Sequence, residues 1–172
     1  MSKVIAVAAL VVVLGLVNWS IIEKEKHLAQ GDIVYLELAP VDPRSLIQGD
    51  YMALEFRVAQ QIYDALPKSD KYRGWNRNAD AGDGFVVVKL DAERRADFVR
   101  IYTGGVLDKN EIKMQYRVRN GAVKFATNAF FFQEGHAQSY EAARYGQFRV
   151  NTRGEVLLAG MFDKDLKHIT GQ

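Results

Sequence analysis

The sequence contains no cysteine and only three histidines among its 172 residues. Without cysteine, the chain can form neither a disulfide framework nor a thiolate metal site. The histidines, His27, His136 and His168, lie far apart, and no two of them have the helical spacing of paired metal ligands. We therefore predict no metal site, and nothing in the sequence indicates a cofactor.

A strong charge of either sign is also lacking. Lysine and arginine number 23 against 21 acidic residues, which leaves a net charge of +2. The basic residues are scattered, and no stripe of them alternates with aromatic residues in the way that nucleic-acid-binding surfaces require. We predict that nucleic acid is not a partner of this protein.

One long hydrophobic run is present near the N-terminus. Val4 to Ile22 is nineteen residues without a charge, and at about 1.5 Å per residue a helix of that length just spans a hydrocarbon core of roughly 30 Å. A cleaved signal peptide is the alternative interpretation. The run is long for such a peptide, and the residues after Asn18 offer no small-x-small cleavage site. The sequence therefore favours an uncleaved membrane anchor.

Charges beside the run predict its orientation. Lys3 and the α-amino group precede the run, whereas the two acidic and two basic residues of 23–26 cancel. The positive-inside rule then places the N-terminus in the cytoplasm and the rest of the chain outside. We predict a single-pass protein of the inner (cytoplasmic) membrane. Residues 1–30 would form a transmembrane anchor with a helical stalk, and residues 31–172 would form an extracytoplasmic, mostly-β domain facing the periplasm.

Beyond Gly31 the apolar residues alternate, which indicates strands rather than helices. The continuous apolar run Phe85–Leu90 is typical of a strand buried on both faces. We predict an α+β fold of mostly antiparallel β structure, with about eight strands, two short helices and the N-terminal transmembrane helix. The other expected strands are Ile33–Leu38, Tyr51–Val58, Phe98–Tyr102, Glu111–Val118, Val123–Ala126, Asn128–Phe132, Gly146–Val150 and Glu155–Ala159, and the expected short helices are Gln60–Leu66 and Glu134–Arg144.

The stretch from Asp42 to Phe56 combines a proline turn with a Gly-Asp restart into a strand. The residues that carry the pattern are Pro40, Asp42, Pro43, Arg44, Leu46, Gly49, Asp50, Tyr51, Leu54 and Phe56. This pattern resembles the GDYXXLXY family, a group of bacterial membrane-anchored proteins named after the motif, whose last tyrosine is replaced here by Phe56. The family's C-terminal block is similar to Phe130–Gly135, to the Tyr140–Tyr145 run and to Gly146–Val150. The resemblance implies a polytopic membrane protein as partner.

Two surfaces hold the candidate binding residues. The first contains the Asp-Pro turn. Arg44 could form an ion pair with Asp42 or Asp50 and so stabilise this turn, or it could bind a carboxylate or phosphate of a ligand. Tyr51 follows at the start of the strand. The second surface is the expected helix at 134–144. In a structural interpretation Glu134 caps the helix and His136 is a surface histidine, whereas in a functional one the two residues act as acid and base. Its candidate residues are Glu134, His136, Tyr140 and Arg144.

Catalytic candidates are limited to Ser45 and Lys89. A serine shortly before a Gly-Asp step and a lysine on a later apolar strand resemble the dyad of signal-peptidase-like Ser-Lys hydrolases. Burial beside the apolar strand would lower the pKa of the Lys89 amine and let it act as a base. The Ser-Met-x-Pro setting of those hydrolases is absent around Ser45.

The sequence thus favours a non-enzymatic, membrane-tethered extracytoplasmic domain that binds or supports another envelope or membrane protein. Two alternatives stay open. One is the Ser-Lys hydrolase, and the other is a sensor domain that binds a small ligand through Arg44 or His136.

Overall fold

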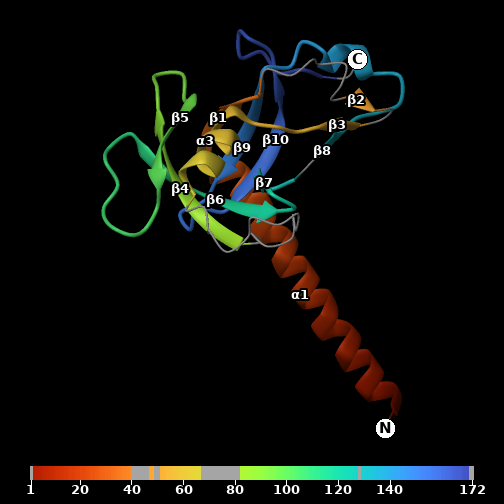
Figure 1. Cartoon of the computed structure of the whole chain (residues 1–172). Coiled ribbons are helices and arrows are strands. Elements are labelled where there is room, and N and C mark those ends of the chain that lie inside the picture. The colour runs from red at the N-terminus through yellow and green to blue at the C-terminus, as the bar shows by residue number, and fades with distance from the viewer. Residues whose placement is uncertain (1, 40–46, 49–50, 67–81, 128, 171–172) are drawn as a thin grey trace.

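The computed structural model of the chain describes residues 2–39, 47–48, 51–66, 82–127 and 129–170. A long N-terminal helix, α1 (Ser2–Gln30), projects away from a β domain (Figure 1). At about 1.5 Å per residue its 29 residues extend roughly 43 Å, more than a hydrocarbon core requires. Asn18 lies within the apolar run, and its Nδ2 donates to the Leu14 carbonyl at 2.8 Å. The helix itself therefore satisfies this polar side chain.

Three antiparallel sheets make up the β domain, and within them every pairing among the described residues is antiparallel. This arrangement, with an apolar N-terminal helix, confirms the predicted mostly antiparallel α+β fold. In spatial order, the first sheet consists of β1 (Asp32–Glu37), β9 (Tyr145–Val150) and β10 (Val156–Phe162), the second of β5 (Ala96–Ile101), β4 (Gly82–Leu90), β6 (Glu111–Arg119) and β7 (Ala122–Lys124), and the third of β2 (Ile47–Gln48), β3 (Tyr51–Ala53) and β8 (Ala129–Phe131).

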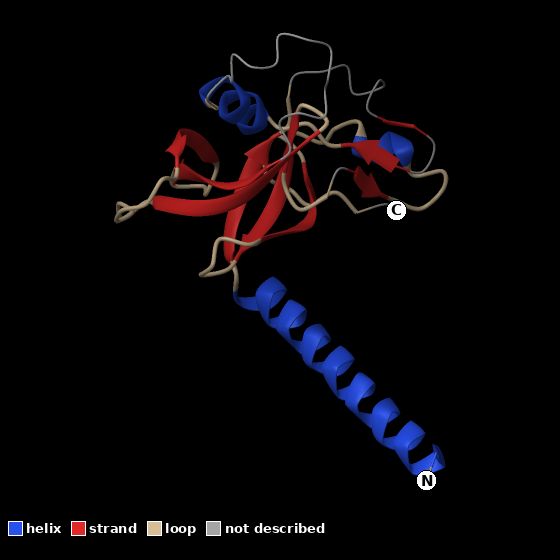
Figure 2. Cartoon of the chain, turned by 60° about the horizontal axis from the view of Figure 1, so that its bottom comes forward, coloured by secondary structure: helices blue, strands red, loops and turns tan. Residues whose placement is uncertain are grey.

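The first sheet has a helix-proximal end and a distal end. β1 begins at Asp32, directly after α1, and Asp32 pairs with Val150 at the end of β9. The turn that joins β9 to β10 therefore lies beside the end of α1. At the other end of the sheet, β1 finishes at Glu37. At about 3.3 Å per residue, the two ends of β1 are roughly 17 Å apart. In Figure 2, α1 leaves the domain on the side away from the small third sheet.

Three phenylalanine rings form the centre of the core. Phe148 on β9 is fully buried, and its ring centroid lies 5.3 Å from that of Phe56 and 6.2 Å from that of Phe125. Phe56 and Phe125 are also 6.2 Å apart and meet edge to face. This arrangement adds to the area that each ring buries. The core thus joins the first sheet to the segments that follow β3 and β7.

Two predicted elements have different extents in the structure. The expected strand Tyr51–Val58 ends at Ala53 in β3, and helix α3 (Arg57–Ala65) begins at its far end. Val58 and Ile62, four residues apart on one face of α3, are both buried. After Phe56, the spacing of the buried residues therefore changes from every second residue to about every 3.6 residues. The apolar residues of this stretch fit both spacings, so the sequence pattern did not indicate where the strand ends.

The expected helix Glu134–Arg144 is much shorter. Helix α4 covers only Ala137–Tyr140, because Gly135 takes a left-handed conformation with φ of 84° before it. After α4 the chain turns back to the first sheet, where the Arg144 amide donates to the Phe162 carbonyl at 2.8 Å.

Candidate functional site

Of the candidate binding and catalytic residues in the stretch from Asp42 to Phe56, Tyr51 is the one that lies within the described residues. Asp42, Arg44, Ser45 and Asp50 lie outside the described residues. Tyr51 is half-buried on β3, and its ring centroid lies 5.9 Å from that of Phe131 on β8.

Lys89 is exposed on β4, where its register partners are Asp97 on β5 and Glu111 on β6. Cross-strand pairing with carboxylates is a sufficient structural role for a lysine at this position. Its exposure differs from the burial beside the apolar strand that the hydrolase hypothesis assumes. The Ser45–Lys89 pair stays an untested prediction.

The candidates near α4 are not gathered around one site. Tyr140 is buried, and its ring lies between Phe132, stacked at 5.0 Å, and Phe130 at 5.2 Å. His136 is half-buried, and within the described part of the chain its Nδ1 has no hydrogen-bond partner. Glu134 and Arg144 are exposed. Tyr140 is therefore a packing residue, and no hydrogen bond joins Glu134 to His136 among the described residues.

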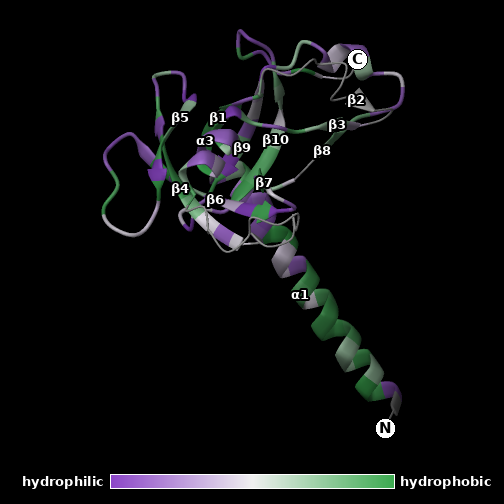
Figure 3. Cartoon of the chain, in the orientation of Figure 1, coloured by the Kyte–Doolittle hydropathy of each residue, from purple (hydrophilic) through white to green (hydrophobic). Residues whose placement is uncertain are grey.

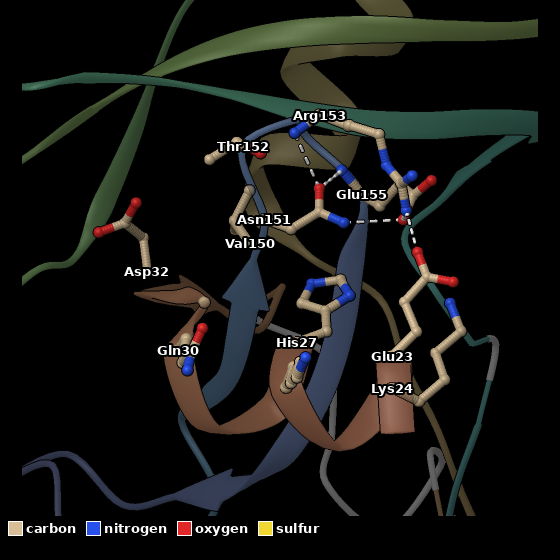
Figure 4. Close-up of a pocket in the computed structure, with 12 residues that line it drawn as sticks. Glu23, Lys24, His27, Gln30, Asp32, Val150, Asn151, Thr152, Arg153 and Glu155 are labelled. Carbon is tan, nitrogen blue, oxygen red and sulfur yellow. Dashed lines mark hydrogen bonds and ion pairs between the residues drawn. The ribbon is translucent and has the colours of Figure 1, made fainter. Parts of the chain in front are cut away.

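A cavity of about 360 Å³ lies where α1 meets the β domain (Figure 4). The last two turns of α1 form one wall, and the turn between β9 and β10 forms the opposite one. Most of the cavity's lining residues are polar or charged, whereas the part of α1 farther from the domain is mainly hydrophobic (Figure 3). The lining residues are Glu23, Lys24, Lys26, His27, Gln30, Gly31, Asp32, Val150, Asn151, Thr152, Arg153 and Glu155.

His27 is the centre of this junction. Its side chain is only 6% exposed, and its Nε2 lies 2.9 Å from the Arg149 carbonyl of β9. A donated bond requires the tautomer with the proton on Nε2. The Gly31 amide donates to the His27 carbonyl at 2.9 Å, and Arg149 Nη1 donates to the Gly31 carbonyl at 3.2 Å. The end of α1 is thus joined to β9 by two hydrogen bonds, one to the Arg149 carbonyl and one from the Arg149 side chain.

Arg153 links the turn to the helix. Its Nη2 donates to Glu23 Oε1 at 2.7 Å and to Glu155 Oε2 at 3.0 Å. The hydrogen bond with Glu23 is the main reason why the pKa of Arg153 is raised. The pKa of Glu155 is lowered, chiefly because Asn151 Nδ2 donates to its carboxylate at 2.8 Å. Both groups therefore stay charged at neutral pH.

Asn151 orders the turn itself. Its Oδ1 accepts from the backbone amides of Arg153 and Glu155, each at 3.0 Å. Gly154 then takes φ of 86°, and a Cβ at this position would lie 2.9 Å from the Lys113 carbonyl oxygen of β6. The wall opposite α1 is therefore a fixed turn that rests on the second sheet.

The alanine variant of Gly31 tests this junction. A Cβ at position 31 would lie 2.6 Å from the His27 carbonyl oxygen and 3.1 Å from Arg149 Cβ. We expect Gly31→Ala to lower the free energy of unfolding by about 1–3 kcal/mol and to speed amide hydrogen exchange in β1. Gly15→Ala is the matched control, because a Cβ at position 15 meets nothing within 4 Å. Equal exchange rates in β1 of the two variants would contradict the junction described above.

Sequence reasoning missed most of this site. It treated His27 only as one of three separated histidines and assigned no role to Arg149, Arg153 or Glu155. The one available signal was the short gap between the expected strands Gly146–Val150 and Glu155–Ala159, where the structure has the turn of an antiparallel hairpin. Nothing local links that turn to Glu23, which is 130 residues away. In the described part of the chain, no three His, Asp or Glu side chains gather in a way that would hold a metal ion.

Comparison with known proteins gives one match. The sequence model of the GDYXXLXY protein family matches residues 13–161, from the middle of α1 to the end of β10. No match was found among curated proteins or solved structures.

Proposed function

Since this chain belongs to the GDYXXLXY family, we propose that it is a membrane-tethered domain that α1 holds on the outer side of the inner membrane. The domain would bind or support another envelope protein there. The observation that carries the proposal is the surface of α1, whose most apolar window has a mean hydropathy of 2.5 and is not buried by any part of the domain. An apolar helix exposed on all sides needs a membrane or a partner to cover it.

Retention of α1 is supported by its junction with the domain. A secretory signal is removed from a mature protein, whereas the end of α1 packs a buried side chain, His27, against the β domain. His27 bonds to the sheet, and Glu23 pairs with Arg153. Cleavage just before Glu23 would cut within an unbroken helix. The orientation rests on Lys3, which the positive-inside rule favours on the cytoplasmic side.

A partner surface is supported on the third sheet, on the far side of the domain from α1 (Figures 1 and 2). Phe130 and Phe132 turn inward onto Tyr140, so the alternation of β8 holds Phe131 outward, where it is 73% exposed. Tyr51 lies beside it. A rigidly presented aromatic pair of this kind is typical of the anchors of protein–protein interfaces.

Site-specific photo-crosslinking in membranes tests this surface. With a photoreactive phenylalanine at position 131, we expect one dominant adduct that stays in carbonate-washed membranes. Val106 provides the matched control, because it is even more exposed, at 93%, but lies in the loop after β5. The same adducts from both positions, or none from position 131, would contradict a partner at this sheet.

No observation favours the alternative functions to the same degree. For the Ser-Lys hydrolase, Ser45 lies outside the described residues and Lys89 is exposed on β4. For a small-ligand sensor, His136 is the only one of its two predicted residues in the described ranges, and it does not line the cavity at the junction.

A further inference from the structure

We propose that the cavity at the junction of α1 with the β9–β10 turn binds the phosphate of an anionic phospholipid headgroup. The contacts would be the ammonium groups of Lys24 and Lys26. This inference rests on the proposed function in one respect, since it requires α1 to be the membrane anchor. It then assigns the cavity a ligand that the anchor brings within reach.

The depth of the cavity fits a headgroup. Its lining on α1 begins at Glu23, the residue directly after the uncharged run that ends at Ile22. His27 lies five residues beyond Ile22, a rise of about 7.5 Å. The polar layer on each side of a bilayer is roughly 5–8 Å thick. The cavity therefore lies at the level of the headgroups when the apolar run fills the hydrocarbon core.

The charges around the cavity favour an anion. All three of its carboxylates are already paired with arginine: Glu23 and Glu155 with Arg153, and Asp32 with Arg94 at 3.4 Å. By contrast, Lys24 and Lys26 form no ion pair within the described residues. Lys24 interacts with the Glu155 carboxylate only through a longer-range Coulombic attraction. The two ammonium groups are thus the charges in the cavity that no ion pair neutralises, and a phosphate group would supply a partner.

Helix geometry directs both lysines to the cavity. At 3.6 residues per turn, Glu23, His27 and Gln30 share the face of α1 that meets the β domain. Lys24 and Lys26 flank this face on either side, and both line the cavity, whereas Glu25 lies on the opposite face and does not. Figure 4 shows Glu23 and Lys24 on one side of His27, with Gln30 and Asp32 on the other.

The size of the cavity and its surroundings favour a lipid over a free ion. A volume of about 360 Å³ is at the small end of ligand sites, enough for a headgroup but not for acyl chains. One turn below Glu23 on the same face of α1 lies Trp19, which is 75% exposed. Tryptophan at this depth typically lies at the membrane interface. The glycerol and acyl chains of a lipid held by the two lysines would extend along this side chain.

Native mass spectrometry of the full chain tests the proposal. The protein is reconstituted into phosphatidylcholine nanodiscs that contain a minor fraction of phosphatidylglycerol, and is then released into mild detergent. We expect one retained phosphatidylglycerol. Each lysine near an anionic surface contributes about fivefold to affinity, so the double variant Lys24→Gln/Lys26→Gln should retain about thirtyfold less. An excess of inorganic phosphate should leave the bound lipid in place.

The matched control is Lys164→Gln/Lys167→Gln, which removes the same charge. Both of its positions follow β10, at the end of the first sheet that lies far from α1, and this variant should retain the lipid as the wild type does. A chain that enters nanodiscs but retains no lipid would refute the headgroup site and leave the anchor standing.

Failure to enter nanodiscs at all would refute both proposals. Three further results would each overturn the headgroup proposal. These are equal retention by both double variants, equal retention of phosphatidylcholine, and displacement of the lipid by inorganic phosphate.

Discussion

Phe148→Ala should lower the free energy of unfolding of the β domain by about 3–5 kcal/mol. The Phe148 side chain is fully buried and contacts the rings of both Phe56 and Phe125. Truncation would remove the buried ring and leave a cavity between the first sheet and the segments packed on it. Domains of this size are stable by only roughly 5–15 kcal/mol, so the variant would lose a large share of its stability. Urea denaturation of the full chain in mild detergent, followed by circular dichroism, measures this loss.

Phe131→Ala is the matched control for that measurement, because it makes the same chemical change at a ring that is 73% exposed. Its ring contacts Tyr51, and we expect a loss of under about 1 kcal/mol. If the two variants unfold at the same urea concentration, the three-ring cluster is not the centre of the core.

Val13→Arg should remove the protein from the membrane. Val13 is the middle residue of the uncharged run and is 54% exposed on α1. On the insertion scale for transmembrane helices, arginine at the centre costs about 2.5–3.5 kcal/mol, whereas valine is slightly favourable. The sum of about 3 kcal/mol corresponds to a more than hundredfold shift towards the uninserted state. The fraction of protein that remains in carbonate-washed membranes measures this shift.

Val13→Leu is the control, and it should be retained as well as the wild type, because leucine inserts at least as favourably as valine. A Val13→Arg protein that stays in the washed membranes to the same extent would show that α1 is not what holds the chain there.

The parts of the fold that were predictable are those determined by local pattern. Val4–Ile22 was recognisable as an apolar helix by length alone. Asn120 and Gly121 take φ of 52° and 71°, as the two-residue turn between β6 and β7 requires. The prediction of a β4 strand buried on both faces is confirmed at Val86, Val87 and Val88, each of which has no exposed surface.

The family motif was predictable in its apolar half. Met52, Leu54 and Phe56 are all buried, as their alternation indicates. Phe56 packs edge to face against Phe148, so this chain uses the motif's last aromatic position for packing without the tyrosine hydroxyl.

The junction was not predictable, because it depends on contacts between distant segments. His27 and Arg149 are 122 residues apart, and only the register of β1 on β9 brings them together. Before that register is known, Glu23–Gln30 reads as a solvated stalk with balanced charge. The strand expected at Tyr51–Val58 was too long at its C-terminal end for another reason. Residues 56 and 58 have the spacing of a strand, whereas residues 58 and 62 have the spacing of a helix. Val58 and Ile62 are both buried in α3, so the helical spacing is the one that the structure uses.

The most direct test is the intact mass of the protein after intact cells are treated with a membrane-impermeant maleimide. The chain has no cysteine, so Lys164→Cys, at a side chain that is 79% exposed, provides the only reactive thiol. We predict that carbonate-washed membranes yield the full-length chain, from Met1 onward apart from processing of that methionine, carrying one label. A soluble protein that lacks about the first twenty residues would contradict the anchored domain, and a full-length but unlabelled chain would contradict its outward orientation.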